Sequence, residues 1–311
     1  MKIGIPTALL YYWFGNVWED FWRDSGQEVI TSPITDHRMV QAGSAVAVDE
    51  LCLPIKIFLG HVQFLLPRVD LVMIPHLIKI EPEAYICPKF MGLPDLVSQA
   101  IPESRDRLLS VKVGPTRTDM FKSLQYSAVK LGIKKTLIAK ANFDLNMGRP
   151  QILPSLERQL SFNSPKKQLC LKLGLLGHPY ALYDSFFNLD LLKRLTDDNI
   201  SFVTPEMTPR EFKGVGAAKL DKKIFWTMGR SQFDALEWML NSSAVKVDGY
   251  IQIAPFACGL EAIIGDLLER RIKTARQPLL KLNFEEHSGE AGMVTRIEAF
   301  LDLIRYRKLA C

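Results

Sequence analysis

The stretch Pro54–Ile74, PIKIFLGHVQFLLPRVDLVMI, decides the fold class of this chain. Proline favours the first turn of a helix, so Pro54 predicts a helix that begins there and runs to about Leu66. Asp70–Ile74 (DLVMI) then reads as an apolar strand of the kind that is buried on both faces. A helix that leads into a fully buried strand is typical of a parallel sheet covered by helices.

The same alternation of strand and helix continues through the chain. Further strands are predicted at Lys2–Ile5, Glu28–Thr31, Leu108–Val113, Leu169–Leu176, Ile200–Val203, Lys223–Thr227, Gly249–Ala254 and Pro278–Leu282. Further helices are predicted at Phe14–Ser25, Asp36–Ala42, Thr118–Leu131, Asp184–Leu195, Gln232–Asn241, Glu261–Arg270 and Glu290–Tyr306. This order predicts an α/β fold with mostly parallel, doubly wound sheets of the Rossmann or flavodoxin type.

The length of 311 residues is enough for two such domains. The best linker is Asn163–Lys167 (NSPKK), which is polar and contains a proline. We therefore expect an N-terminal α/β domain at 1–164, a C-terminal α/β domain at 165–311 and a cleft between them.

Composition excludes several classes of protein. Hydrophobic residues make up 48% and charged residues 23%, which is a globular rather than a disordered or fibrous balance. The net charge of +5 is scattered in short pairs such as Lys134-Lys135, so no nucleic-acid partner is expected. No apolar run is long enough to cross a membrane, and no secretory signal is visible. Five cysteines, an odd number, favour a reducing cytoplasm.

Three cysteines lie in loops beside predicted helix starts. Cys52 lies in DELCLP, Cys87 in YICPKFMGLPD after a strand, and Cys258 in APFACG between a strand and a helix. Helix N-termini present free N–H groups and a partial positive charge, which stabilise thiolates. No Cys-x-x-Cys pair is present, so core packing remains the alternative for each. Cys170 is expected in a strand core and Cys311 in the tail.

Three other polar residues are candidates for chemistry. His178 and His287 each follow a predicted strand, and either could move a proton. For His178 a backbone-bonded loop histidine is the competing interpretation, and His287 could instead be a cluster neighbour or a capped structural residue. Glu50 lies two residues before Cys52 and could transfer protons there, or could simply interact with the helix dipole. The chain contains no GxxxxGK[ST] sequence, so it is not expected to bind ATP through a P-loop.

Several strings resemble one family of proteins. They are IGIPTALLYY (3–12), DELCLPIK (49–56) with Gly60-His61, CPKF (87–90) with GLPD (92–95), FACG (256–259), and EEHSGEAG (285–292) with Thr295-Arg296. Together they resemble the acyl-CoA dehydratase activase-related proteins, which are similar to the cluster-bearing subunits of 2-hydroxyacyl-CoA (2-hydroxyglutaryl-CoA-like) dehydratases. The match covers most of the chain.

This resemblance implies a cofactor and its ligands. In the dehydratases three cysteines hold a 4Fe–4S cluster, and the matching positions here are Cys52, Cys87 and Cys258. Since cubane clusters usually take four thiolates, three would leave one iron open. Because two of the cysteines fall in the first domain and one in the second, the cluster would lie in the cleft.

The resemblance also implies a function, with alternatives. It favours a cytoplasmic 4Fe–4S protein of anaerobic metabolism, in low-potential electron transfer or in reductive dehydration of a 2-hydroxyacyl-CoA. The expected partners are an ATP-dependent activase or another cluster protein, an acyl-CoA thioester and further copies of the chain. The alternatives are a non-enzymatic electron-transfer or assembly partner, and a zinc-bound or metal-free α/β protein. Whether the chain is itself a lyase stays open at this point.

Overall fold

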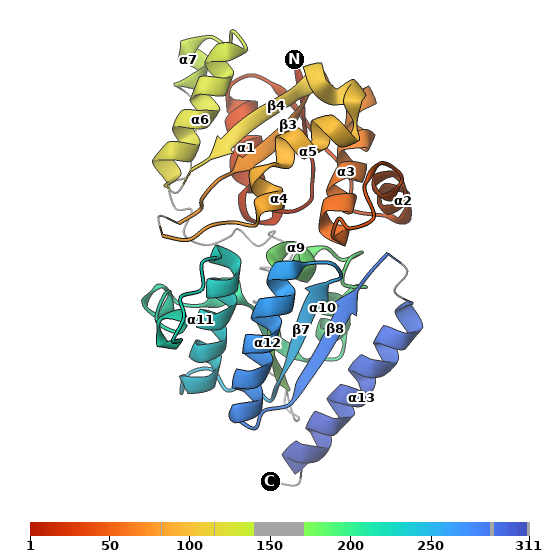
Figure 1. Ribbon diagram of the computed structural model, residues 1–311, viewed down its shortest axis with the longest axis vertical. Helices are drawn as coiled ribbons and strands as arrows, with labels where there is room; N and C mark the ends of the chain where they lie inside the picture. Colours follow the sequence, from red (N-terminus) through yellow and green to blue (C-terminus); the bar gives the residue numbers. More distant parts are fainter. Residues whose placement is uncertain (82, 115, 140–170, 287–288, 310–311) are drawn as a thin grey trace. The chain divides into compact units, whose positions relative to one another are not determined.

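The computed structural model describes residues 1–81, 83–114, 116–139, 171–286 and 289–309. The chain divides into two compact units (Figure 1). The first consists of Met1–Gln151 with Phe225–Thr227, and the second of Ile152–Ile224 with Met228–Cys311. The expected linker Asn163–Lys167, and with it the boundary at 164/165, lies outside the described residues, as do Cys170, His287 and Cys311.

The first unit is built on a parallel sheet whose order is β2-β1-β3-β4. Its strands are β1 (Lys2–Ile5), β2 (Glu28–Thr31), β3 (Leu71–Leu77) and β4 (Leu108–Val113). Its helices are α1 (Tyr11–Asp24), α2 (His37–Val46), α3 (Leu53–Leu65), α4 (Pro88–Met91), α5 (Leu93–Ala100), α6 (Arg117–Lys130) and α7 (Lys135–Ile138), with short 3₁₀ turns at Leu66–Arg68 and Pro102–Arg107.

The second unit repeats this topology with the order β6-β5-β7-β8, again all parallel. Its strands are β5 (Lys172–Leu176), β6 (Ser201–Val203), β7 (Gly249–Pro255) and β8 (Leu279–Phe284). Its helices are α9 (Pro179–Tyr183), α10 (Leu191–Asp197), α11 (Thr227–Asn241), α12 (Gly259–Thr274) and α13 (Glu290–Leu309), with 3₁₀ turns at Pro205–Met207, Arg210–Phe212 and Ala217–Lys219. The predicted α/β fold with two tandem Rossmann or flavodoxin-like sheets is confirmed.

The central strands carry the core of each unit. Val72, Met73 and Ile74 on β3 are fully buried, as DLVMI predicts, and Ile251 and Ile253 on β7 are their counterparts in the second unit. A parallel strand covered by helices on both faces has no solvent side, which explains the continuous apolar run.

Helices α2 and α3 touch backbone to backbone. A Cβ atom on Gly43 would lie 1.7 Å from the carbonyl oxygen of Lys56, and one on Gly60 would lie 1.9 Å from that of Met39. Helix α2 is capped by Asp36, whose side chain accepts a hydrogen bond from the N–H of Met39. This close crossing holds α3, and therefore the residue that precedes it, in place.

Two predicted elements are wrong. Lys223–Thr227 is not a strand, because Trp226 forms only an isolated bridge with Tyr85 and α11 begins at Thr227. Asp184–Leu195 is not one helix, because α10 begins only at Leu191. The reason is local side-chain competition: the Asp184 and Asn188 side chains accept hydrogen bonds from the N–H groups of Phe187 and Leu191, and so form turns in place of a helical ladder.

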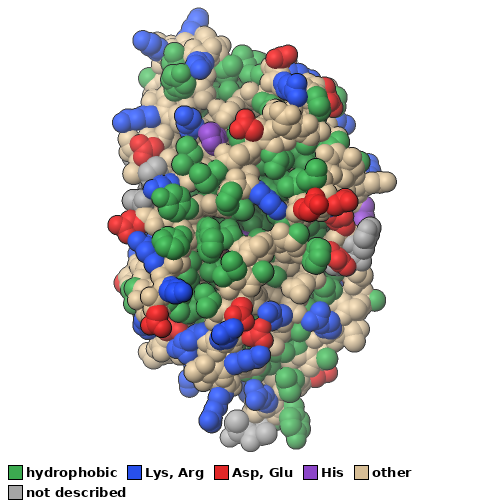
Figure 2. Space-filling view, in the orientation of Figure 1, with side chains coloured by type: hydrophobic (Ala, Val, Ile, Leu, Met, Phe, Trp, Pro, Cys, Tyr) green, Lys and Arg blue, Asp and Glu red, His purple; other side chains and the backbone are tan. Residues whose placement is uncertain are grey.

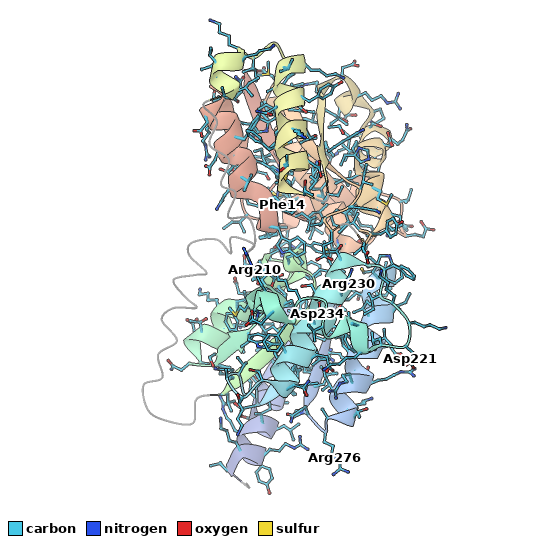
Figure 3. All side chains as sticks on the ribbon, turned by 90° about the vertical axis from the view of Figure 1, so that its left-hand side faces the viewer. Phe14, Arg210, Asp221, Arg230, Asp234 and Arg276 are labelled. Carbon is cyan, nitrogen blue, oxygen red and sulfur yellow. The ribbon has the colours of Figure 1, made fainter. Side chains whose placement is uncertain are left out.

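The segment before α11 is held by one carboxylate. Asp234, labelled on α11 in Figure 3, accepts hydrogen bonds from the N–H groups of Gly214 at 2.6 Å and Ala217 at 2.8 Å.

Basic and acidic side chains are interspersed on the face shown in Figure 2. Among the described helices, none is both long and apolar enough to cross a bilayer.

Candidate functional site

Each of the three candidate ligands is the residue that immediately precedes a helix. Cys52 caps α3, Cys87 caps α4 and Cys258 caps α12. Proline follows within the first turn at Cys52 and Cys87, where its missing N–H costs nothing because those N–H groups have no partner in the helix. None of the three cysteines forms a disulfide. Each of the three cysteines therefore lies beside a helix start, as the sequence predicts.

The structure brings Cys52 and Cys87 together in the first unit. Cys52 is buried, at 7% exposure, and Cys87 is half-buried. The sulfur of Cys52 is close enough to raise the pKa of Cys87 electrostatically. The two loops are also tied, since Lys89 Nζ lies 3.5 Å from the backbone oxygen of Glu50.

Burial is the main influence on the Cys87 thiol and raises its pKa. The backbone N–H groups of Lys89 and Phe90 and the charge of Lys89 act in the opposite direction and favour the thiolate. Because burial outweighs these opposing influences, the thiol stays protonated until a metal ion binds to it. Metal binding at Cys87 would therefore release a proton.

Cys258 stands on a constrained turn in the second unit. β7 ends at Pro255, and Ala257 adopts a left-handed backbone with φ of 58°. The N–H of Cys258 donates to the carbonyl of Pro255 at 3.2 Å, and α12 starts directly after it. A left-handed alanine costs about 1 kcal/mol or more, so the surrounding contacts hold this turn against its own strain.

The three cysteines are divided between the units. Cys52 and Cys87 belong to the first unit and Cys258 to the second. In the part of the chain that the structure describes, no group of three or more His, Cys, Asp and Glu side chains has the arrangement of a metal site.

His178 belongs to a buried polar cluster in the second unit. It caps α9 just beyond β5 and is 1% exposed. Its Nδ1 lies 2.7 Å from the hydroxyl of Tyr180, and its Nε2 lies 3.2 Å from Glu261 Oε2, although that second contact is not aligned as a hydrogen bond. Burial lowers the pKa of His178, and the Glu261 carboxylate partly opposes that shift. His178 is thus bonded to side chains, and the backbone-bonded interpretation is wrong.

Sequence reasoning missed the other members of this cluster. Glu261 accepts hydrogen bonds from Gln232 Nε2 at 3.0 Å and from Gln252 Nε2 at 3.3 Å. All three side chains are buried. One feature of the sequence could have indicated this cluster: an acidic residue, Glu261, lies three residues after Cys258 at a helix start. Nothing in the sequence points to the two glutamines.

Glu50 and His61 differ in their exposure to solvent. Glu50 is exposed on the loop before Cys52. His61 lies on α3 and is fully buried, with Nδ1 2.7 Å from Ser32 Oγ and Nε2 3.0 Å from Thr35 Oγ1. Burial lowers the pKa of His61 to about 4, so this histidine is neutral and joins α3 to the segment after β2.

The chain matches a protein-family model over most of its first two thirds. The family model described as the CoA enzyme activase uncharacterised domain (DUF2229) matches residues 2–208. The matched range includes Cys52, Cys87 and His178, and it ends before Cys258. No curated protein sequence matches the chain. Since the family model covers more than half of its residues, the chain belongs to the CoA enzyme activase domain family.

Proposed function

We propose that this chain is an iron–sulfur component of an acyl-CoA dehydratase system, acting in low-potential electron transfer. Membership of the CoA enzyme activase family supports the association with such a system. The observation that carries the proposal is that Cys52, Cys87 and Cys258 each cap a helix, with the first two brought together. An activase-driven dehydratase is the expected partner.

The donor set fits a 4Fe–4S cluster. Thiolate sulfur is the ligand that such clusters use, and helix starts supply N–H donors for thiolate and sulfide. At Cys87 the N–H groups of Lys89 and Phe90 already favour the thiolate. When bound, a cluster on three cysteines would supply one-electron chemistry and one iron with an open coordination position. The protein's own residues would exclude water and set the local charge.

Reductive dehydration of a 2-hydroxyacyl-CoA by this chain itself is the second candidate. It is favoured by the buried Tyr180–His178–Glu261 contacts, which join three groups that can hold protons at the edge of the second sheet. Glu50, exposed beside Cys52, and His287, after β8, are further proton donors for this candidate. The thioester would be the substrate in this case, whereas in the first it would bind to the partner.

Anaerobic purification and reconstitution test the cluster. We expect about four iron and four sulfide per chain and a broad visible absorption. Cys52→Ala, Cys87→Ala and Cys258→Ala should each lower the iron content and the absorption, whereas the control Cys311→Ala should not. Zinc in place of iron, or iron content unchanged in all three variants, would contradict the proposal.

Turnover separates the two candidate functions. The reconstituted protein is mixed with an ATP-dependent activase and a 2-hydroxyacyl-CoA, and both cluster reduction and the enoyl-CoA product are measured. Reduction without product supports electron transfer alone. Product that disappears with His178→Gln, while the cluster remains, supports dehydration by this chain.

A further inference from the structure

The loop that carries Cys87 is bound by a segment that is distant in the sequence. The N–H of Tyr85 donates to the carbonyl oxygen of Phe225 at 2.6 Å, and the N–H of Thr227 donates to the carbonyl oxygen of Tyr85 at 2.9 Å. Tyr85 and Trp226 thus form an isolated parallel bridge. Because both backbone groups of Tyr85 are bound, the position and the orientation of this residue are fixed.

The 225–227 segment belongs to the first unit, whereas the residues on either side of it along the chain belong to the second. Ile224 and Met228, which flank the segment, are both buried, so each end of it is anchored. The segment lies beyond residues 2–208, the range that the family model matches. The Cys87 loop is therefore held by a part of the chain that the family match does not include.

Cys87 lies between two fixed points. Tyr85 is two residues before it, so the α-carbons of Tyr85 and Cys87 are at most about 7 Å apart. Ile86, between them, is buried. On the other side, the carbonyl oxygen of Cys87 accepts a hydrogen bond from the N–H of Phe90 at 2.9 Å, in the first turn of α4. A shift of Tyr85 would therefore reach the backbone of Cys87 through a single residue.

We propose that Phe225 and Thr227 are positioning residues of Cys87: their backbone groups hold Tyr85 and so place the thiol that would bind the cluster. The inference rests on the proposed function for the role of Cys87 as a ligand. Within the described part of the loop itself, the hydrogen bond from the N–H of Ala84 to the carbonyl oxygen of Glu81 is long, at 3.4 Å. The bonds to the 225–227 segment are shorter, so they are the stronger constraint.

The test variant is Thr227→Pro, which removes one N–H group. Thr227 is the first residue of α11, where proline is well tolerated, and Trp226 before it takes part in a β-bridge, the extended setting that suits a residue before proline. Thr227→Val is the matched control. It keeps the N–H and the branched shape, and it removes only a buried hydroxyl that has no hydrogen-bond partner among the described residues.

Alkylation of the metal-free protein by iodoacetamide measures the positioning directly. The rates are followed by mass spectrometry on the Cys87 and Cys258 peptides, and Cys258 is the internal reference because a general loss of stability would expose both thiols. Thr227→Pro should raise the ratio of the Cys87 rate to the Cys258 rate about fivefold, since losing one hydrogen bond makes local opening more frequent by about that factor. Thr227→Val should keep the wild-type ratio. An unchanged ratio in Thr227→Pro would overturn the proposal.

The reconstituted holoprotein gives a second readout. In Thr227→Pro the EPR spectrum of the reduced cluster should change, and iron should pass to a chelator about fivefold faster than in the wild type, because the displaced thiol opens more often. Thr227→Val should match the wild type in both measurements. Equal changes in the two variants would assign the effect to the hydroxyl and overturn the role of the backbone.

If circular dichroism shows that Thr227→Pro does not fold, Phe225→Gly is compared with Phe225→Ala. The Phe225 side chain is exposed, so neither variant removes a core contact. Glycine gives the 225–227 segment more backbone freedom than alanine does, so the ratio of the Cys87 rate to the Cys258 rate should be about threefold higher with glycine. Equal ratios would overturn the proposal.

The two proposals fail in different ways. A wild-type protein that takes up no cluster contradicts the proposed function, whereas the alkylation ratio is measured without a cluster. Cluster uptake with the same alkylation ratio and the same EPR spectrum in the wild type and in Thr227→Pro overturns only the role of the 225–227 segment.

Discussion

The α-carbon of Gly60 faces the carbonyl oxygen of Met39 so closely that a Cβ atom there would lie 1.9 Å from that oxygen. Since backbone atoms cannot move aside as a flexible side chain can, α2 and α3 can cross at this distance only through glycine. Cys52 caps α3 one residue before its first turn, so the crossing also determines where that thiol lies.

Gly60→Ala should therefore lower the free energy of unfolding by at least about 2–3 kcal/mol. Urea unfolding followed by circular dichroism measures the change. Gly292→Ala is the control, because α13 leaves open space around that glycine. It should be neutral or stabilising by up to about 1 kcal/mol. A Gly60→Ala protein as stable as wild type would contradict the close crossing.

Stability should fall as the pH is lowered because of His61. Its pKa is about 4 in the folded protein and about 6.5 in the unfolded chain, so between these values the unfolded state binds more protons. The stabilisation is fully present above pH 6.5, and about 2 kcal/mol of it is lost between pH 7 and pH 5. The measurement compares urea unfolding of the wild type and His61→Gln at both values.

His61→Gln should reduce this pH dependence without abolishing it, since burial also lowers the pKa of His178. His37→Gln, at an exposed position on α2, serves as the control and should keep the dependence of the wild type. Equal slopes in wild type and His61→Gln would show that His61 is not held neutral.

The metal-free Cys87 thiol should react slowly at neutral pH. Burial raises its pKa, so the rate of alkylation by iodoacetamide, followed on the Cys87 peptide by mass spectrometry, should reach half its maximum only above pH 9. Lys89→Met should move that midpoint further up because it removes a charge that favours the thiolate. A midpoint below pH 8 would contradict the burial of this thiol.

Ala257 should tolerate glycine and resist a branched side chain. Its left-handed backbone strains any residue with a Cβ atom. Ala257→Gly should raise the free energy of unfolding by about 0.5–1 kcal/mol, and Ala257→Val should lower it by about 1–2 kcal/mol. Thermal unfolding ranks the three proteins, and a valine variant as stable as the glycine variant would show that the turn is not left-handed.

Much of the fold could be predicted because its signals are local. The predicted strand Leu108–Val113 has the same bounds as β4, and the helix expected from Pro54 to Leu66 is α3 within one residue at each end. Proline at the helix start and apolar runs at the strands act within a few residues of where they stand. The error at Asp184–Leu195 arose where side chains bonded to nearby backbone and replaced a helical turn.

The sequence by itself determined the alternation of strands and helices and the position of Cys52, Cys87 and Cys258 beside helix starts, since both follow from neighbouring residues. It did not predict the helix that Cys87 precedes, Pro88–Met91. Only the tertiary structure decided that Cys52 and Cys87 lie close to each other, and that Glu261 contacts Gln232, Gln252 and His178. Those contacts join residues that are far apart in the chain. They depend on the strand order β6-β5-β7-β8 and on close packing, which no local pattern records.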